Sequence, residues 1–95
     1  MITYESMIIK NIPIINKLGL HARASAKFVA TASRFQSHIE VCKGNQTVNG
    51  KSIMGVMMLA ASQGTILELR IDGPDEQEMM ETLENLIEQR FGETE

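Results

Sequence analysis

Isoleucine recurs with the spacing of a strand near the start of the chain. The segment 8–15, IIKNIPII, places Ile12 and Ile14 on one face, as the period-two alternation of a strand requires. Pro13 lies on the other face and cannot donate a hydrogen bond to a neighbouring strand. The pattern therefore predicts an edge strand, followed by a loop in which Gly19 permits a tight approach of the backbone.

Residues from Ala22 to about Ser33 repeat apolar side chains with the spacing of a helix. Mostly small side chains mark one stripe, and further apolar side chains widen it. We expect this face to pack on the core. The stripe consists of Ala22, Ala26, Val29 and Ser33, and it is widened by Phe28, Ala32 and Phe35.

Two further strands are expected to form a hairpin. Residues 38–43, HIEVCK, alternate Ile39 and Val41 with polar neighbours, which is typical of a half-buried strand. A glycine and an asparagine follow, and residues 46–49, QTVN, then form a short second strand. A turn of this composition between two such segments predicts a hairpin.

A short helix and a further strand are predicted after the hairpin. Ser52 precedes IMGVMML and is a good N-cap, so a short helix is expected to begin at Ile53. Gly64 ends that region. Residues 65–71, TILELRI, show the clearest strand alternation in the chain. The core face of this strand carries Leu67, Leu69 and Ile71.

The segment DGPDEQEMMETLENLIEQR predicts the last helix. Pro74 lies near its first position, and Arg90 lies in its last turn. The acidic side chains of the first turn suit the positive end of the helix dipole. These acidic residues are Asp75, Glu76 and Glu78, and the apolar stripe of the helix is Met79, Leu83, Leu86, Ile87 and Phe91.

The predicted order is strand, helix, strand, strand, short helix, strand, helix. Each helix must bury one apolar stripe and each strand offers one apolar face. One antiparallel sheet with all helices on one side and water on the other satisfies both requirements. We therefore expect an α+β fold of the βαββαβα type, an open-faced β-sandwich of four strands and three helices, with residues 1–95 forming a single domain.

Composition narrows the classes of function. The 43% hydrophobic content of the 95 residues predicts a packed domain, and a net charge of -3 with only nine Lys and Arg argues against nucleic acid as a partner. A single cysteine, Cys42, cannot form an internal disulfide, which fits a reducing compartment. We see no signal-peptide pattern at the start and no apolar run near the ~20 residues of a membrane span. A cytoplasmic protein without membrane insertion is expected.

The segment 18–29, LGLHARASAKFV, carries the strongest candidate chemistry. His21 precedes the first turn of a predicted helix, where backbone N–H groups lack internal partners and the dipole favours anions. The N–H groups of Ala22 and Arg23, with the Arg23 guanidinium, therefore form a candidate phosphate-binding site. A neutral imidazole there has a free lone pair that can attack phosphorus.

Other interpretations of these side chains remain open on spacing alone. His21 could be a helix cap, and Arg23 could be a solvated side chain. His38 is expected to be solvated on the polar face of its strand. Cys42 shares that face and lacks a basic neighbour of known geometry, so we assign it no redox role. The histidines and the cysteine lack metal-ligand spacing, so neither a metal nor another cofactor is predicted.

Two motifs, LGLHARASAKFVATAS and VNGKSIMGVMMLAA, resemble the histidine-containing phosphocarrier protein (HPr) family of the bacterial phosphotransferase system. The resemblance runs from about Met7 to Phe91 and implies the same open-faced sandwich. It implies that His21 takes phosphate on Nδ1 from enzyme I and passes it to an enzyme IIA, while Arg23 balances the phosphate charge. Such a carrier is not itself an enzyme. The family commonly has proline where this chain has Ala24. Unlike proline, alanine has a backbone N–H donor, and because alanine favours helices we still expect the helix to form.

The second motif implies regulation and docking. In many HPr proteins its serine, here Ser52, is phosphorylated by HPr kinase/phosphorylase. The following helix has too many apolar residues to bury them all, and we expect Val56 and Leu59 to pack in the core. Methionine adapts to several partners, and exposed apolar patches tend to be interfaces. The expected patch for partner binding is Ile53, Met54 and Met57.

A different class of function is a regulatory binding protein that acts through Ser52 and the apolar patch without using His21. A small anion-binding enzyme is disfavoured, because the motif around His21 contains no acidic partner. For the carrier we expect a monomer.

Overall fold

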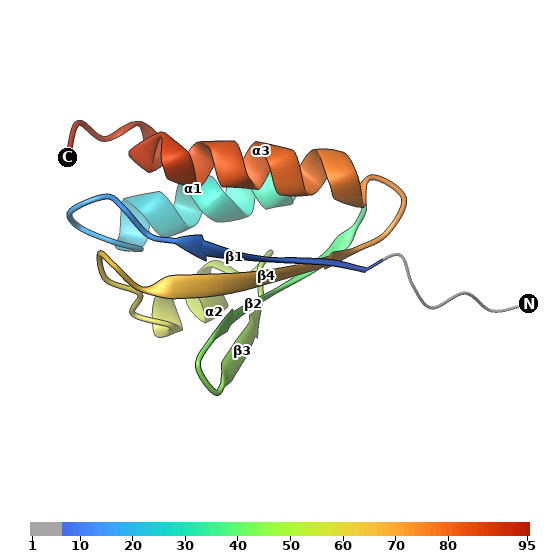
Figure 1. Cartoon of the computed structure of the whole chain (residues 1–95), viewed down its shortest axis with the longest axis horizontal. Coiled ribbons are helices and arrows are strands. Elements are labelled where there is room, and N and C mark those ends of the chain that lie inside the picture. Colours follow the sequence, from blue (N-terminus) through green and yellow to red (C-terminus); the bar gives the residue numbers. More distant parts are fainter. Residues whose placement is uncertain (1–6) are drawn as a thin grey trace, which may run out of the picture.

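Four antiparallel strands form one sheet in the order β1-β4-β2-β3 (Figure 1). The computed structural model describes residues 7–95, so the expectation about a signal peptide concerns residues that lie largely outside the described part. The strands are β1 (Ile8–Pro13), β2 (His38–Lys43), β3 (Gln46–Asn49) and β4 (Ile66–Asp72). The helices are α1 (Ala22–Ala32), α2 (Ile53–Met58), α3 (Glu76–Glu88) and the short 3-10 turn η1 (Arg90–Gly92).

Strand β1 lies at one edge of the sheet and pairs with β4, with Pro13 opposite Ile66. The predicted edge position is therefore confirmed, and its reason is the missing backbone donor of Pro13. The predicted hairpin is confirmed as β2 and β3, which pair from Glu40 opposite Asn49 to Lys43 opposite Gln46.

The core lies between one face of the sheet and the helices. Ile39 is opposite Ile71 and Val41 is opposite Leu69, and all four side chains are buried. All three α-helices add to the same cluster through Phe28, Val56, Leu59, Met79 and Leu83. On the opposite face, β2 and β4 carry Glu40, Glu68 and Arg70. The predicted α+β open-faced sandwich is confirmed.

The core-facing side of α1 differs from the predicted stripe. Ala22, Ala26 and Ser33 are exposed, and of that stripe only Val29 is buried. The three residues predicted to widen the stripe, Phe28, Ala32 and Phe35, are buried as expected, and Ala24 and Ser25 pack beside them. Alanine occurs on both the packed and the exposed face of this helix, so small side chains alone could not identify the packed face.

The last helix is shorter than predicted at both ends. It begins at Glu76, after the N-cap Asp75, and ends at Glu88. Arg90 therefore lies in η1 rather than in the last turn, and Arg90 and Phe91 have positive φ. This bend returns Phe91 to the core, where it is buried. The bend also directs the last residues of the chain toward the loop that precedes α1 (Figure 1).

The two residues of β2 that faced water in the prediction have different environments. His38 is exposed, as expected, whereas Cys42 is 5% exposed and accepts a hydrogen bond from the Thr47 hydroxyl at 3.4 Å. Arg70, on the same face of β4, is its basic neighbour, which the sequence did not reveal.

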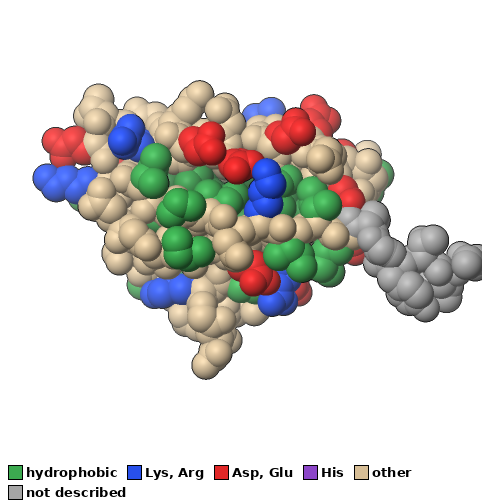
Figure 2. All heavy atoms as spheres, in the orientation of Figure 1, with side chains coloured by type: hydrophobic (Ala, Val, Ile, Leu, Met, Phe, Trp, Pro, Cys, Tyr) green, Lys and Arg blue, Asp and Glu red, His purple; other side chains and the backbone are tan. Residues whose placement is uncertain are grey.

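Lys and Arg side chains lie scattered over the face seen in Figure 2, between apolar and acidic ones. Within residues 7–95, the helices are all too short or too polar to cross a bilayer.

Candidate functional site

His21 ends the loop after β1 and is the N-cap residue of α1. Its backbone is extended, and its carbonyl accepts the Ser25 N–H at 2.8 Å. The expectation that His21 could be a helix cap is therefore confirmed for its position, but its side chain makes no capping hydrogen bond. The imidazole is 29% exposed and thus open to a partner from one side.

The loop before His21 is fixed by close backbone packing. Gly19 has a φ of +68°, and a Cβ at this position would meet the Ala61 carbonyl oxygen at 2.4 Å. The next residue, Leu20, donates its N–H to the same carbonyl at 2.8 Å. The Ser25 hydroxyl donates to the Leu20 carbonyl at 3.0 Å, which ties the loop to α1. These contacts determine where the His21 side chain begins.

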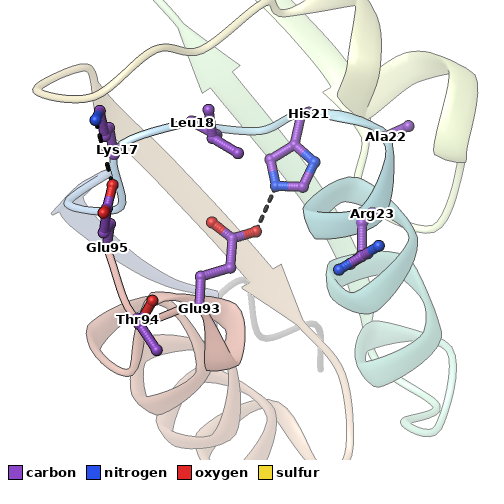
Figure 3. Close-up of a pocket in the computed structure, with 8 residues that line it drawn as sticks. All are labelled: Lys17, Leu18, His21, Ala22, Arg23, Glu93, Thr94 and Glu95. Atoms are coloured by element: carbon purple, nitrogen blue, oxygen red, sulfur yellow. Dashed lines mark hydrogen bonds and ion pairs between the residues drawn. The ribbon is translucent and has the colours of Figure 1, made fainter.

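An acidic partner for His21 comes from the far end of the chain. The Nε2 atom of His21 is hydrogen-bonded to Oε2 of Glu93 (Figure 3). The second carboxylate oxygen, Oε1, accepts a hydrogen bond from Nδ2 of Asn16 at 2.9 Å. The sequence motif did not reveal Glu93, because it lies 72 positions after His21 and no pattern in the motif points to it.

The hydrogen bond from Asn16, followed by that from His21, lowers the pKa of the Glu93 carboxyl below its ordinary value of 4.5. Burial opposes this change but is outweighed. Glu93 is therefore a carboxylate at neutral pH and can only accept hydrogen bonds. It follows that the His21–Glu93 hydrogen bond has its proton on Nε2.

A cavity of about 590 Å³ opens beside His21 (Figure 3). Arg23 projects along it from the first turn of α1, and Nδ1 of His21 faces the start of the same helix (Figure 3). The first N–H groups of α1 have no acceptors within the helix. The cavity is lined by Lys17, Leu18, His21, Ala22, Arg23, Glu93, Thr94 and Glu95. It combines a nucleophilic nitrogen with donors for an anion, as a phosphoryl group requires.

The predicted site residues fall into two groups. His21, Ala22 and Arg23 line the cavity together, whereas Ser52 and the apolar residues after it belong to α2. Ser52 is the N-cap of α2, and its hydroxyl accepts the Gly55 N–H at 3.1 Å, as predicted.

The apolar side chains of α2 divide as expected between core and surface. Val56 and Leu59 are buried, and the predicted patch residues Ile53, Met54 and Met57 are exposed, with Met54 at 72%. Met58 is also exposed, at 68%. We call Ile53, Met54, Met57 and Met58 the α2 patch. Helices α1 and α2 are in contact, so His21 and this patch lie on neighbouring elements.

No group of three His, Cys, Asp or Glu side chains in the described part of the chain is arranged to hold a metal ion. The cavity itself presents the imidazole of His21 and the guanidinium of Arg23.

Comparison with known proteins finds similar chains over nearly the whole length. Residues 8–89 match the family model described as the PTS HPr component phosphorylation site. The phosphocarrier protein HPr of Neisseria meningitidis serogroup A is 60% identical over 89 residues, which cover 94% of this chain and 100% of that protein.

Solved structures show the same fold. A crystal structure of HPr from Thermoanaerobacter tengcongensis superposes with a TM-score of 0.89 at 51% identity, covering 93% of this chain and 99% of that one. A crystal structure described as an HPr dimer from the same organism has a TM-score of 0.74 at 55% identity, covering 86% and 94%.

Proposed function

The chain belongs to the HPr family of phosphocarrier proteins, and from that membership we propose that His21 accepts a phosphoryl group from phosphorylated enzyme I and delivers it to an enzyme IIA. By family the chain is a phosphocarrier of the phosphotransferase system and not an enzyme. The observation that carries the proposal is the position of His21, whose Nδ1 faces the start of α1 in a cavity that Arg23 lines.

In the proposed transfer, the lone pair of His21 Nδ1 attacks the phosphorus of the donor's phosphoryl group. A P–N bond forms to Nδ1 while the donor's bond to phosphorus breaks, and its electron pair leaves with the donor. The ring keeps its proton on Nε2 and so becomes a positively charged phosphohistidine. Onward transfer reverses these events, with the acceptor's nucleophile attacking phosphorus and the electron pair returning to Nδ1.

The proposed role of Arg23 is to balance the charge of the phosphoryl group. A guanidinium matches phosphoryl oxygens in geometry and keeps its charge at any working pH. The N–H groups of Ala22 and Arg23 at the start of α1 add donors and the positive end of the dipole. One charge-assisted hydrogen bond contributes about 1.5–3 kcal/mol, so Arg23→Gln should slow phosphoryl acceptance by roughly 10- to 100-fold.

The test is phosphorylation with phosphoenolpyruvate and enzyme I. The protein should acquire an acid-labile, base-stable phosphate, as phosphohistidine does, and the His21→Ala variant should acquire none. His38→Ala is the matched control, because His38 is the other histidine of the chain and is exposed on β2. An unlabelled wild-type protein, or labelling that survives in His21→Ala, would contradict the proposal.

A second function, regulation through Ser52, is supported by the exposed α2 patch that follows this residue. In the proposed reaction with HPr kinase/phosphorylase, the Ser52 oxygen attacks the terminal phosphorus of ATP, ADP leaves and the hydroxyl proton is released. The resulting dianion suits the start of α2 locally but adds negative charge beside the patch. We propose that the patch contacts enzyme I and enzyme IIA, and that phosphorylation of Ser52 weakens this contact.

Incubation with ATP and the kinase should give an acid-stable phosphate that is absent from Ser52→Ala. The phosphorylated protein should bind enzyme I more weakly than the unmodified one in a titration. A phosphorylated protein with unchanged affinity would reject the regulatory proposal and leave Ser52 with its capping role alone. Sedimentation of the free protein checks the expected monomer.

A further inference from the structure

We propose that Glu93, held in place by Asn16, is a positioning residue that keeps the proton of His21 on Nε2 and so leaves Nδ1 as the nucleophile. The inference rests on the proposed phosphoryl transfer to His21, and it adds the reason why one ring nitrogen rather than the other carries the phosphoryl group.

The two carboxylate oxygens of Glu93 accept hydrogen bonds from different side chains. Oε2 accepts from Nε2 of His21, and Oε1 accepts from Nδ2 of Asn16 at 2.9 Å. Because both partners are donors and a carboxylate only accepts, the arrangement is satisfied with the proton on Nε2. A neutral ring then carries its lone pair on Nδ1, on the side that faces the start of α1 (Figure 3).

Asn16 is fully buried in the loop after β1. Its Nδ2 donates to the Gly19 carbonyl and to Glu93, each at 2.9 Å, while its Oδ1 has no hydrogen-bond partner among the described residues. The reversed amide would place its oxygen against a carbonyl and a carboxylate, which are both acceptors. The side chain therefore presents its donors to Glu93 and holds the carboxylate in one orientation.

The segment that carries Glu93 is anchored on both sides of this residue. The Lys17 N–H donates to the Glu95 carbonyl at 2.8 Å, and Lys27 Nζ donates to the Phe91 carbonyl at 2.7 Å. These bonds lie on both sides of Glu93 and fasten the end of the chain to the loop and to α1. The carboxylate is thus presented by an anchored backbone rather than by a free end.

The consequence for transfer is that no proton has to move. Nε2 carries its proton before the phosphoryl group arrives, keeps it while Nδ1 is phosphorylated, and keeps it after the group leaves. In the intermediate the ring is positively charged, and the Glu93 carboxylate faces that charge across the hydrogen bond. Glu93 touches His21 rather than the phosphoryl group, so its role is to position and polarise the ring.

The direct test is the tautomer of His21 in the unphosphorylated protein, read from the ring ¹⁵N shifts above the pH at which the ring is protonated. Wild type should show the Nε2–H form almost alone. In Glu93→Gln the amide can face the ring with either a donor or an acceptor, so the Nδ1–H form should rise severalfold. Glu95→Gln is the matched control, because it removes the same charge from the same cavity while Glu95 pairs with Lys17.

The second readout is phosphoryl acceptance from enzyme I. Glu93→Gln should be slower than Glu95→Gln by roughly tenfold to a hundredfold, mainly in the rate at saturating enzyme I, and Glu93→Asp should recover part of the loss. Equal tautomer populations and equal rates in Glu93→Gln and Glu95→Gln would overturn the role of Glu93. An unlabelled wild type would instead overturn the proposed function, and the tautomer measurement would still decide the position of the proton.

Discussion

Replacement of Gly19 by alanine should cost far more stability than the same replacement at Gly44, although both glycines have similar backbone angles. Gly19 has a φ of +68° and Gly44 a φ of +57°, so an alanine is strained at either position. The left-handed region costs an L-residue with a Cβ roughly 1–2 kcal/mol. The lower entropy of the unfolded chain with alanine offsets about 0.4–1 kcal/mol of that. About 1 kcal/mol therefore remains at each position.

The surroundings of the added Cβ make the difference. At Gly44 nothing lies within 4 Å, whereas at Gly19 the Cβ would lie 2.4 Å from the Ala61 carbonyl oxygen and 2.9 Å from the Ser62 Cα. Both are backbone atoms, so the overlap can be relieved only by moving one loop away from the other. Overpacking of this kind costs typically 1–3 kcal/mol. The expected loss is then about 2–4 kcal/mol for Gly19→Ala and about 1 kcal/mol for Gly44→Ala.

Urea unfolding followed by circular dichroism gives both free energies. The Gly19 carbonyl accepts a hydrogen bond from Asn16, and Gly19 lies two residues before His21 in the chain. Gly19→Ala should therefore also slow phosphoryl acceptance, while Gly44→Ala should not. Equal losses of stability in the two variants would refute the steric reasoning. A destabilised Gly19→Ala with a normal rate of acceptance would show that the loop does not control the position of His21.

Three further substitutions test the Ser52 cap, the α2 patch and the Asp75 carboxylate. Ser52→Ala should lower the free energy of unfolding by about 1 kcal/mol, because the Gly55 N–H loses its acceptor, and an unchanged value would mean that this cap adds nothing. Met54→Glu should weaken binding of enzyme I in a titration, whereas Ile66→Glu, at another exposed apolar position on β4, should not, and equal effects would place the α2 patch outside the interface. The hydrogen bonds from Ser37 and from the Gln36 N–H lower the pKa of Asp75 below 3.8, so its contribution to stability is present above that pH and is lost as the pH falls through the lower value. The stability difference between wild type and Asp75→Asn should therefore shrink on acidification below about pH 4, and a constant difference would contradict this.

Strand periodicity predicted the sheet well, because each strand has one buried face and the alternation of side chains records it directly. Leu67, Leu69 and Ile71 are fully buried, and the edge position of Pro13 follows from its missing N–H. The α1 helix was harder, because an Ala- and Ser-rich helix has almost the same small side chains on every face. There the packed face is selected by where Phe28 fits into the core.

The candidate site combines residues that are adjacent in the chain with one that is distant in the chain. His21 and Arg23 could be found from sequence because the phosphate-binding property of a helix start depends on residues that are adjacent in the chain. Glu93 could not, because its contact with His21 depends on the bend at Arg90 and Phe91, where both residues adopt positive φ. Neither residue type favours that conformation, so nothing local predicts it. The burial of Phe91 holds the bend in place. The acidic partner of the histidine is therefore determined by the hydrophobic core rather than by the motif around His21.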